Sequence, residues 1–423
     1  MRTLAILVML AVALPLSSAR AEEVTLRVTI PTALKLFRIG TDQFNEQNKG
    51  KYRAELDMIA LESMVEKQMT HFMSRSDAYD VHGIHSSWMN TVARNLVPLN
   101  PYVSKLGPDL GMYGTGTMNS VSVKGSIIGL PVRGPGTNIL YFRKDLFEAA
   151  GLKPPTTPDE VLNAARKLTQ KGPDGQVQRY GYSYMAGAPY WSVVTLADHL
   201  FPRGVYFMTE DYQDANPELK GEVAVAVLQY LKRFLDEGLI PNPLAWGSDE
   251  NIVAIKEGRV AMSMESSGKV GFVEVEKESR VAGKMGYMPG PLSKGGQYPP
   301  RMFGFVWMFS IDRNSKKKDA AYEYIKFMAS EKAQRAMAIE AGNDPSVRGV
   351  LESPEYRKTN PGAPAVVKIR YDIGSRTPLA VPENPMLSKA VHEEFHSFLL
   401  GKQDAATTLG RMYDRIRVIM KKA

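Results

Sequence analysis

The order of apolar and polar residues in the first third of the chain predicts strands that alternate with helices. Residues 24–30 (VTLRVTI), 51–59 (KYRAELDMI) and 79–84 (YDVHGI) are short, strand-like runs bounded by polar or turn-forming segments. A helix is predicted through residues 64–73, between the second strand and the third, and residues 44–50 follow another predicted helix. Strands that alternate with helices predict a parallel α/β sheet.

The rest of the chain continues this mixture less regularly. Residues 130–142 form another extended run, and residues 301–311 (RMFGFVWMFSI) are apolar almost throughout, which is typical of a strand buried on both faces. Further helices are predicted from Pro158 onward, at 222–236, at 249–257 and through 316–341, with a strand at 259–264. The 423 residues contain no internal repeat and no low-complexity linker, so we expect two α/β lobes without a flexible tether.

The N-terminus has the pattern of a secretory signal peptide. Arg2 precedes an apolar run at residues 4–14, and Ala19-Arg20-Ala21 matches a cleavage site. We therefore expect a mature chain that begins at Glu22 and is exported. No later apolar run reaches the roughly 18 residues that a membrane-spanning helix needs.

Composition narrows the class of protein further. The chain has no cysteine, which excludes disulfides, thiol catalysis and thiolate metal sites, as well as a lipid anchor on cysteine. An exported but unanchored protein implies the periplasm of a Gram-negative type of cell. The net charge is +8, and its lysines and arginines are scattered, so we expect no nucleic-acid partner.

One short motif suggests an enzyme. His392-Glu393-Glu394-Phe395-His396 matches the zinc-protease pattern H-E-x-x-H, in which two histidines on one helix face bind zinc. No histidine or glutamate follows His396 to supply a third ligand. We expect a structural helix with both histidines on a solvated face, and a zinc hydrolase remains a distant alternative. A second possible pair, His82 and His85, would face opposite sides of a strand.

Several segments, in order, resemble one family. The run at 138–169 (NILYFRKDLFEAAGLKPPTTPDEVLNAARKLT) resembles the hallmark of the family 1 extracellular solute-binding proteins, periplasmic receptors of carbohydrate ABC importers that are similar in build to maltose-binding protein. Four further segments resemble the same family: 255–266, 286–296, 303–330 and 382–421. Together they cover nearly all of the mature chain.

The resemblance implies a class II-like fold of two α/β lobes joined by hinge crossings, with the solute in the cleft between them. The expected units are a signal peptide at 1–21, a first lobe at 22–137 plus 305–346, and a second lobe at 138–304 plus 347–423. It also implies capture of a sugar or sugar-like solute by lobe closure, delivery to an importer's permease, a monomer, no cofactor and no catalysis.

Candidate ligand-binding residues follow from the loops that face such a cleft. Tyr190, with Trp191 beside it, resembles the family's Pro-Tyr stacking pair, although ordinary packing is the alternative for both. From the first lobe we expect Pro31, Thr32, His85, Ser86, Ser87, Trp88, Gly136, Thr137 and Asn138. From the second lobe and the crossings we expect Glu265, Ser266, Ser267, Arg301, Phe303, Gly304, Asp344 and Arg348.

Departures from the family pattern bear on the solute. Where malto-oligosaccharide receptors carry Gly-Pro-Trp, this chain has Ser266-Ser267-Gly268, and Ser388 stands at the position of their C-terminal cleft tryptophan. Fewer stacking platforms disfavour a long glucan and favour a monosaccharide, polyol, disaccharide or modified sugar. The alternative is an anionic, phosphorylated or sulfonated solute held by Arg301 or Arg348.

Overall fold

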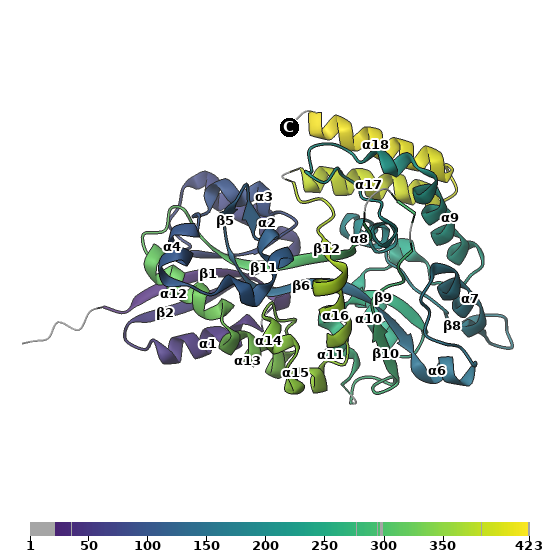
Figure 1. Cartoon of the computed structure of the whole chain (residues 1–423), viewed down its shortest axis with the longest axis horizontal. Helices are drawn as coiled ribbons and strands as arrows, with labels where there is room; N and C mark the ends of the chain where they lie inside the picture. Colours follow the sequence, from purple (N-terminus) through teal and green to yellow (C-terminus); the bar gives the residue numbers. More distant parts are fainter. Residues whose placement is uncertain are drawn as a thin grey trace, which may run out of the picture.

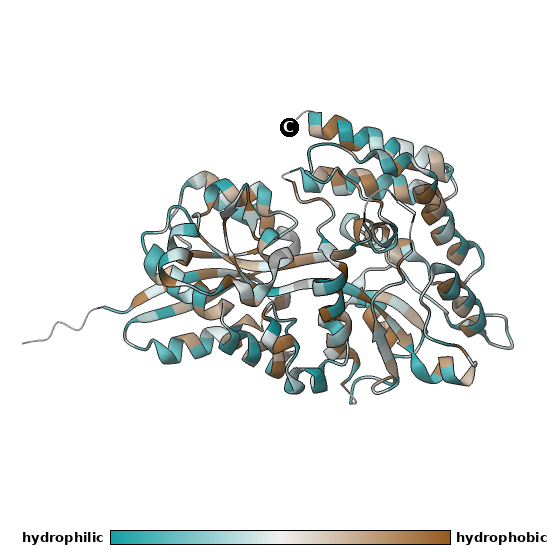
Figure 2. Cartoon of the chain, viewed as in Figure 1, coloured by the Kyte–Doolittle hydropathy of each residue, from teal (hydrophilic) through white to brown (hydrophobic). Residues whose placement is uncertain are grey.

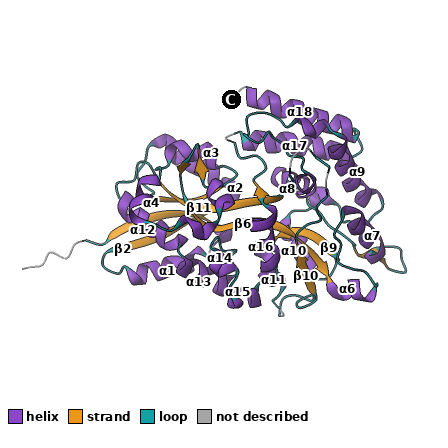
Figure 3. Cartoon of the chain, viewed as in Figure 1, coloured by secondary structure: helices purple, strands orange, loops and turns teal. Residues whose placement is uncertain are grey.

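A computed structural model describes residues 22–34, 36–275, 277–293, 295–296, 299–381 and 383–421. The leader predicted at 1–21 lies outside the described residues. The described chain is a mixed α/β structure whose strands run through the centre, with helices on both sides (Figure 1, Figure 3). No helix among the described residues is both long and apolar enough to cross a membrane.

The first lobe is built on the three predicted parallel strands. β1 (Val24–Pro31) pairs with β2 (Tyr52–Ile59) on one side and with β3 (Val81–His85) on the other, and both pairings are parallel. β11 (Met302–Ile311) then adds to β3 in the antiparallel sense, and β6 (Leu130–Arg143) adds to β11. The parallel sheet predicted from the sequence is therefore confirmed for its first strands and is completed by an antiparallel pair.

The long strand β6 belongs to both lobes. Through Thr137 it pairs with β11, and from Asn138 onward it pairs with β9 (Met262–Ser266) and β10 (Met285–Met288) of the second lobe. Figure 1 shows β6 and β11 side by side across the middle of the molecule. The segment around Asp344 also contacts β6, because the Gly134 amide donates to the carbonyl oxygen of Asp344 at 2.8 Å.

Helices cover both faces of the first-lobe sheet. α1 (Phe37–Gln47) and α12 (Lys318–Ala329) pack on one face, where Phe44 meets Tyr324 edge to face at 5.1 Å. α2 (Leu61–Ser74) and α3 (Met89–Val92) cover the other face over the buried side chains of Val306 and Met308. The helix predicted through 316–341 is interrupted at Ser330, whose side chain accepts the Ala333 amide and begins α13 (Glu331–Ala341).

Helices of the second lobe surround β9, β10 and the end of β6. α8 (Pro189–Leu200) packs against α17 (Asn384–Leu399), which packs in turn on α18 (Ala405–Lys421) at the upper right of Figure 1. α9 (Glu222–Asp236) has the bounds predicted from the sequence. The remaining elements are α4 (Asn100–Leu106), α5 (Thr115–Asn119), β4 (Ser122–Val123), β5 (Ser126–Ile127), α6 (Lys144–Ala149), α7 (Pro158–Leu168), β7 (Gln170–Lys171), β8 (Val177–Arg179), α10 (Ser248–Lys256), α11 (Val270–Val273), α14 (Arg348–Leu351), α15 (Pro354–Thr359), α16 (Ala363–Lys368) and β12 (Ser375–Arg376).

Most residues of the strands are apolar and buried, whereas hydrophilic residues are common on the helices that surround them (Figure 2). All ten residues of β11 are buried, as its apolar sequence predicts. Local signals also act where they were expected. In α7, Thr157 and Glu160 form a capping box that satisfies two backbone amides at the start of the helix.

Gly134 lies at a point of β6 where a side chain has no room. Its φ is +86°, and a Cβ there would come within 2.3 Å of the Gly136 nitrogen and 2.6 Å of the Phe305 oxygen. Gly125 has a similar φ of +81° but nothing within 4 Å, so it isolates the cost of the backbone conformation.

We predict that Gly125→Ala lowers the free energy of unfolding by about 1 kcal/mol, because left-handed backbone disfavours a Cβ. Gly134→Ala adds a clash with backbone atoms that cannot move aside, so its loss exceeds that of Gly125→Ala by at least about 1 kcal/mol. Urea denaturation of both variants measures the difference. Equal losses of unfolding free energy in the two variants would contradict this prediction, because they would show that the backbone around Gly134 shifts to accommodate a Cβ.

Candidate solute site between the lobes

The crossing strands present two faces to the space between the lobes. Side chains alternate along a strand, so Phe305 and Trp307 of β11 lie on one face, and Val306 and Met308 lie on the other. Arg133 of β6 and His85 of β3 are both paired with Trp307. We call the side that carries Arg133, His85, Phe305 and Trp307 the arginine face, and the opposite side the cavity face.

Arg133 reaches from the first lobe to the second. A Cβ added at Gly268, in the turn that follows β9, would lie 2.4 Å from the Arg133 Nη2 atom. The Arg133 Nε atom is buried and makes no hydrogen bond to any described residue. Burial lowers the pKa of the guanidinium, and the Asp344 carboxylate opposes that effect. The sequence predictions missed Arg133; its one signal is a lone arginine inside the apolar run LPVRGPG.

An aromatic wall stands beside Arg133. The His85 ring stacks on Trp88 at 5.1 Å and contacts Phe305 at 4.7 Å. Burial, and secondarily the charge of Arg133, lowers the pKa of His85 to about 3, so the imidazole is neutral. Its Nδ1 atom accepts from the Ser87 amide at 3.2 Å and lies 2.7 Å from the Ser87 hydroxyl. Trp88 is partly exposed, and its Nε1 atom is buried without a hydrogen-bond partner among the described residues.

Tyr190 of the second lobe lies close enough to Arg133 to feel its charge. It lies in the first turn of α8, is 39% exposed, and meets the Trp191 ring edge to face at 4.8 Å. The pKa of its phenol is raised, first by burial among the surrounding chain and then by the charge of Asp198, while Arg133 opposes the rise. Tyr190 and Arg133, from different lobes, therefore share one electrostatic environment.

Asp198 is a second residue that the sequence predictions missed. One carboxylate oxygen accepts from Asn138 Nδ2 at 2.6 Å, whereas Oδ1 is buried without a partner among the described residues. Burial raises the pKa of Asp198 well above its ordinary value. Nothing in the sequence distinguishes this aspartate from an ordinary helix residue, because its environment depends on Asn138, 60 positions earlier.

Other predicted residues use their polar atoms to hold the loops. Both Glu265 oxygens accept from Ser248 Oγ at 3.0 Å, and one also accepts from Asn251 Nδ2 at 2.9 Å. Ser267 donates to Asp344 Oδ2 at 2.7 Å, while Asp344 Oδ1 accepts from Arg370 at 2.9 Å. The bond between Ser267 and Asp344 ties the turn after β9 to the segment around Asp344.

The remaining predicted residues occupy varied places. Thr137 donates to the Phe303 oxygen at 2.6 Å, and Ser266 Oγ accepts from the Gly268 amide at 3.3 Å. Pro31 is buried at the end of β1, and Thr32 is exposed in the turn that follows. Phe303 is buried, and Gly136 packs on the Phe305 ring. Gly304 pairs with Thr137 across the two strands. Arg348 is exposed and forms an ion pair with Glu352 at 3.1 Å.

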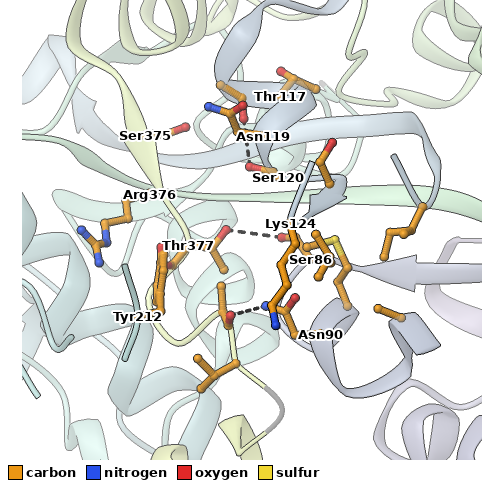
Figure 4. A pocket seen from close by; sticks show the side chains of 18 of the residues that line it. Ser86, Asn90, Thr117, Asn119, Ser120, Lys124, Tyr212, Ser375, Arg376 and Thr377 are labelled. Atoms are coloured by element: carbon orange, nitrogen blue, oxygen red, sulfur yellow. Dashed lines mark hydrogen bonds between the residues drawn. The ribbon is translucent and has the colours of Figure 1, made fainter. Parts of the chain in front are cut away.

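A large cavity of about 1280 Å³ lies on the cavity face (Figure 4). Hydroxyl and amide side chains of the first lobe line it opposite Tyr212, Arg376 and Thr377. The predicted residues Ser86 and Arg301 lie here rather than on the arginine face. The cavity is larger than the roughly 300–1,000 Å³ of sites that enclose drug-sized ligands, although its walls meet where Ser86 Oγ lies 3.4 Å from Thr377 Oγ1.

Two of the arginines on the cavity face share one carboxylate. Arg301 pairs with Glu210 at 2.6 Å, and Arg376 pairs with the other oxygen of Glu210. The Arg376 guanidinium also lies over the rings of Tyr206 and Tyr212, at 4.6 and 4.4 Å. Arg301 and Arg376 therefore have an ion-pair partner, although the Arg376 Nε atom, like that of Arg133, is buried without a hydrogen-bond partner among the described residues.

The H-E-x-x-H motif lies on α17, but the prediction of a solvated face is wrong. His392 and His396 are half-buried against the segment that leads into α8 and that helix's first turn. His392 Nδ1 lies 2.8 Å from Ser192 Oγ, and His396 Nε2 contacts the Ala186 oxygen. Glu393 pairs with Arg415, and the described residues place no third metal ligand beside the two histidines.

Comparison with known proteins now decides the family. The model of the bacterial extracellular solute-binding proteins matches residues 42–335, more than half of the chain. The chain belongs to the bacterial extracellular solute-binding proteins. The resemblance drawn from the sequence is thereby confirmed. This solute-binding protein is 26% identical, over 72% of each chain, to a mannitol-binding protein of Pseudomonas aeruginosa.

A second relative and two solved structures extend the comparison. A probable amino-acid ABC transporter periplasmic-binding protein of Sinorhizobium fredii is 29% identical over 61% of this chain, and the match covers only 56% of that relative. A solute-binding protein of Agrobacterium radiobacter K84 in complex with ribitol is 21% identical, with a TM-score of 0.79, covering 94% of this chain and 99% of that one. The maltose-bound MalE3 of T. maritima is 22% identical, with a TM-score of 0.80, covering 94% and 100%. These structures confirm the two-lobe fold.

The lowered pKa of His85 should make the free energy of unfolding depend on pH. An unfolded histidine has a pKa of about 6.5 and binds a proton below it, whereas folded His85 stays neutral down to about pH 3. The unfolded chain therefore binds more protons within this window, and the free energy of unfolding falls as the pH falls through it.

We predict that His85→Phe makes the loss of stability between pH 7 and pH 5 smaller by about 2 kcal/mol. Urea denaturation at both pH values measures it. Trp88→Phe, which alters the same wall without a titrating group, is the control and keeps the pH dependence of the unchanged protein. An unchanged pH dependence in His85→Phe would contradict the neutral assignment.

Proposed function

We propose that this solute-binding protein captures a neutral sugar or polyol on the arginine face and delivers it to the permease of an ABC importer. The observation that carries the proposal is Arg133, a first-lobe guanidinium that reaches the second-lobe backbone at Gly268 while its Nε lacks a hydrogen-bond partner among the described residues. A solute that bonds to Arg133 would touch both lobes.

The surrounding groups suit a polyhydroxylated solute. A guanidinium donates in a fixed fork that matches two neighbouring hydroxyl oxygens. The Asp198 carboxyl offers an oxygen without a partner among the described residues, and the Trp88 indole offers a donor. The rings of Trp88 and Tyr190, one from each lobe, supply apolar faces for the C–H groups of a sugar or polyol.

The local charges favour a neutral solute over an anion. Arg133 and Arg370 are balanced by Asp344 and Glu265, so the site carries little net charge before the solute arrives. The two arginines on which an anionic solute would have depended, Arg301 and Arg348, are held in ion pairs. Glycerol-3-phosphate-binding proteins of Brucella are also relatives, at 25% identity, so the anionic class stays in the test below.

Relatives support the polyol class. One is a mannitol-binding protein, and the structural neighbours include proteins bound to ribitol and to D-mannitol. A small linear polyol would need fewer stacking platforms than a glucan, in agreement with Ser266-Ser267-Gly268 and with Ser388, which is nearly buried on α17 and donates to Asn384.

Binding is proposed to work by closure of two lobes, with boundaries at 22–137 plus 305–346 and 138–304 plus 347–423. A solute drives closure only through greater affinity for the closed state, which contacts from both lobes provide. We place the protein outside the inner membrane, after removal of residues 1–21, as a binding protein without catalysis and as a monomer. The family assignment supports an extracytoplasmic role and a permease partner.

We predict that Arg133→Ala weakens binding of the solute by about 10- to 150-fold, since hydrogen bonds to a charged group contribute about 1.5–3 kcal/mol. Tyr190→Ala should weaken it about tenfold through loss of the ring face. Isothermal titration against mannitol, ribitol, monosaccharides, disaccharides and glycerol 3-phosphate makes the measurement, after a thermal-shift screen selects the solute.

Arg301→Ala is the matched control, because it removes an arginine from the cavity face. Its affinity for the solute should stay within about twofold of the unchanged protein. Loss of binding in Arg301→Ala, with Arg133→Ala unaffected, would move the site to the other face. Binding of glycerol 3-phosphate but not of any neutral solute would replace the polyol proposal with the anionic one.

A further inference from the structure

Two histidines and an aspartate meet inside the first lobe, away from the crossing strands' solute site. Asp312 Oδ2 lies 2.7 Å from His71 Nε2 and 2.9 Å from His82 Nε2. The three atoms all lie within 4.8 Å of one another, and all three residues are buried. Among the described residues, this is the only such group of three possible metal ligands.

The three side chains come from different elements and are held in place. His71 is on α2, His82 is on β3, and Asp312 directly follows β11. The second oxygen of Asp312 accepts the Asn314 amide at 2.6 Å, and His82 Nδ1 lies 3.0 Å from Thr29 Oγ1. A site whose ligands are fixed by further hydrogen bonds needs little rearrangement to bind an ion.

We propose that His71, His82 and Asp312 form a binding site for a divalent transition-metal ion, with Zn²⁺ as the best fit. Two imidazole nitrogens and one carboxylate oxygen are a ligand set that Zn²⁺ prefers, and three protein ligands leave a fourth position for water. Ligands about 2.0–2.1 Å from a tetrahedral ion lie about 3.3 Å apart, so the 2.7 and 2.9 Å separations must widen by about half an ångström.

The Thr29 hydroxyl gives His82 a hydrogen-bond partner outside the proposed metal site. When the Nε2 atom of His82 binds the ion, the neutral ring carries its proton on Nδ1. The Thr29 hydroxyl then accepts the Nδ1–H of His82, as the outer partners of metal-bound histidines commonly do.

A cavity gives the site access to solvent. A space of about 500 Å³ borders His71 and His82 and is lined by Thr29, Asp57 and Tyr79 among others. Asp80, buried beside His82, adds a second carboxylate whose charge acts on that ring. The net negative charge of Asp312 and Asp80, partly offset by Lys317 at 3.3 Å from Asp80, favours a cation.

The ion would connect three elements of one lobe. The ion would fasten α2 to β3 and to the end of β11. His85 and Trp307, which pair on the arginine face, lie three residues after His82 and five residues before Asp312. The ion touches no second-lobe residue among its proposed ligands, so it should raise the stability of the first lobe while solute affinity stays the same.

The experiment uses the mature chain without a histidine tag, freed of metal by a chelator. Titration with ZnCl₂ should show one ion per chain and a rise in Tm, and CoCl₂ should give the visible absorption of four-coordinate Co²⁺. His71→Gln keeps a donor to Asp312 and removes a metal ligand, so it should weaken Zn²⁺ at least about 100-fold. Thr29→Val should weaken Zn²⁺ binding about 10- to 100-fold, because it removes only the hydrogen-bond partner of His82 Nδ1.

His392→Gln/His396→Gln is the matched control, because it removes the chain's other histidine pair. Its affinity for Zn²⁺ at the first site should be unchanged. Circular dichroism and solute titration confirm that each variant is folded. Failure of the unchanged protein to bind one Zn²⁺, or binding that survives His71→Gln and disappears in His392→Gln/His396→Gln, would overturn the proposal.

Discussion

The structure depends on one pair of antiparallel strands that both lobes share. β6 and β11 pair Gly304 with Thr137 and Phe305 with Gly136 at the point where the chain passes from one lobe to the other. Because side chains alternate along a strand, this pair must offer a different chemical surface to each side of the junction. A solute between the lobes contacts only the side chains on its own side of the strand pair. A change of register by one residue would exchange the two surfaces.

The two sides differ in how their charges are satisfied. On the cavity face, Arg301 and Arg376 share Glu210, and the guanidinium of Arg376 is also covered by two tyrosine rings. On the arginine face, Arg133 retains an Nε atom that lacks a hydrogen-bond partner among the described residues. An unpaired buried donor costs free energy, so a ligand that satisfies it gains affinity. The Arg376 Nε atom on the cavity face is unpaired as well, so our proposal of the arginine face rests on the contact of Arg133 with the second lobe at Gly268.

The sequence predicts the elements well and the site only in part. β1, β6, α9 and β11 lie within a few residues of their predicted bounds, because their apolar periods and turn residues are local signals. The continuous helix expected at 316–341 is wrong, because the cap at Ser330 acts through its side-chain orientation. Family resemblance pointed to Tyr190 and the loop at His85. Arg133, Asp198 and the His71–Asp312 contact, 241 residues apart, depend on which segments the fold brings together, and no local spacing carries that information.

The most direct test is a crystal structure of the mature chain with the sugar or polyol that raises its Tm most. We expect electron density for the solute on the arginine face, bonded to Arg133 and Asp198 and enclosed between the rings of Trp88 and Tyr190. Density in the 1280 Å³ cavity instead, against Tyr212 and Arg376, would contradict the account, because the solute would then lie on the opposite face of β6 and β11 and would not contact Arg133.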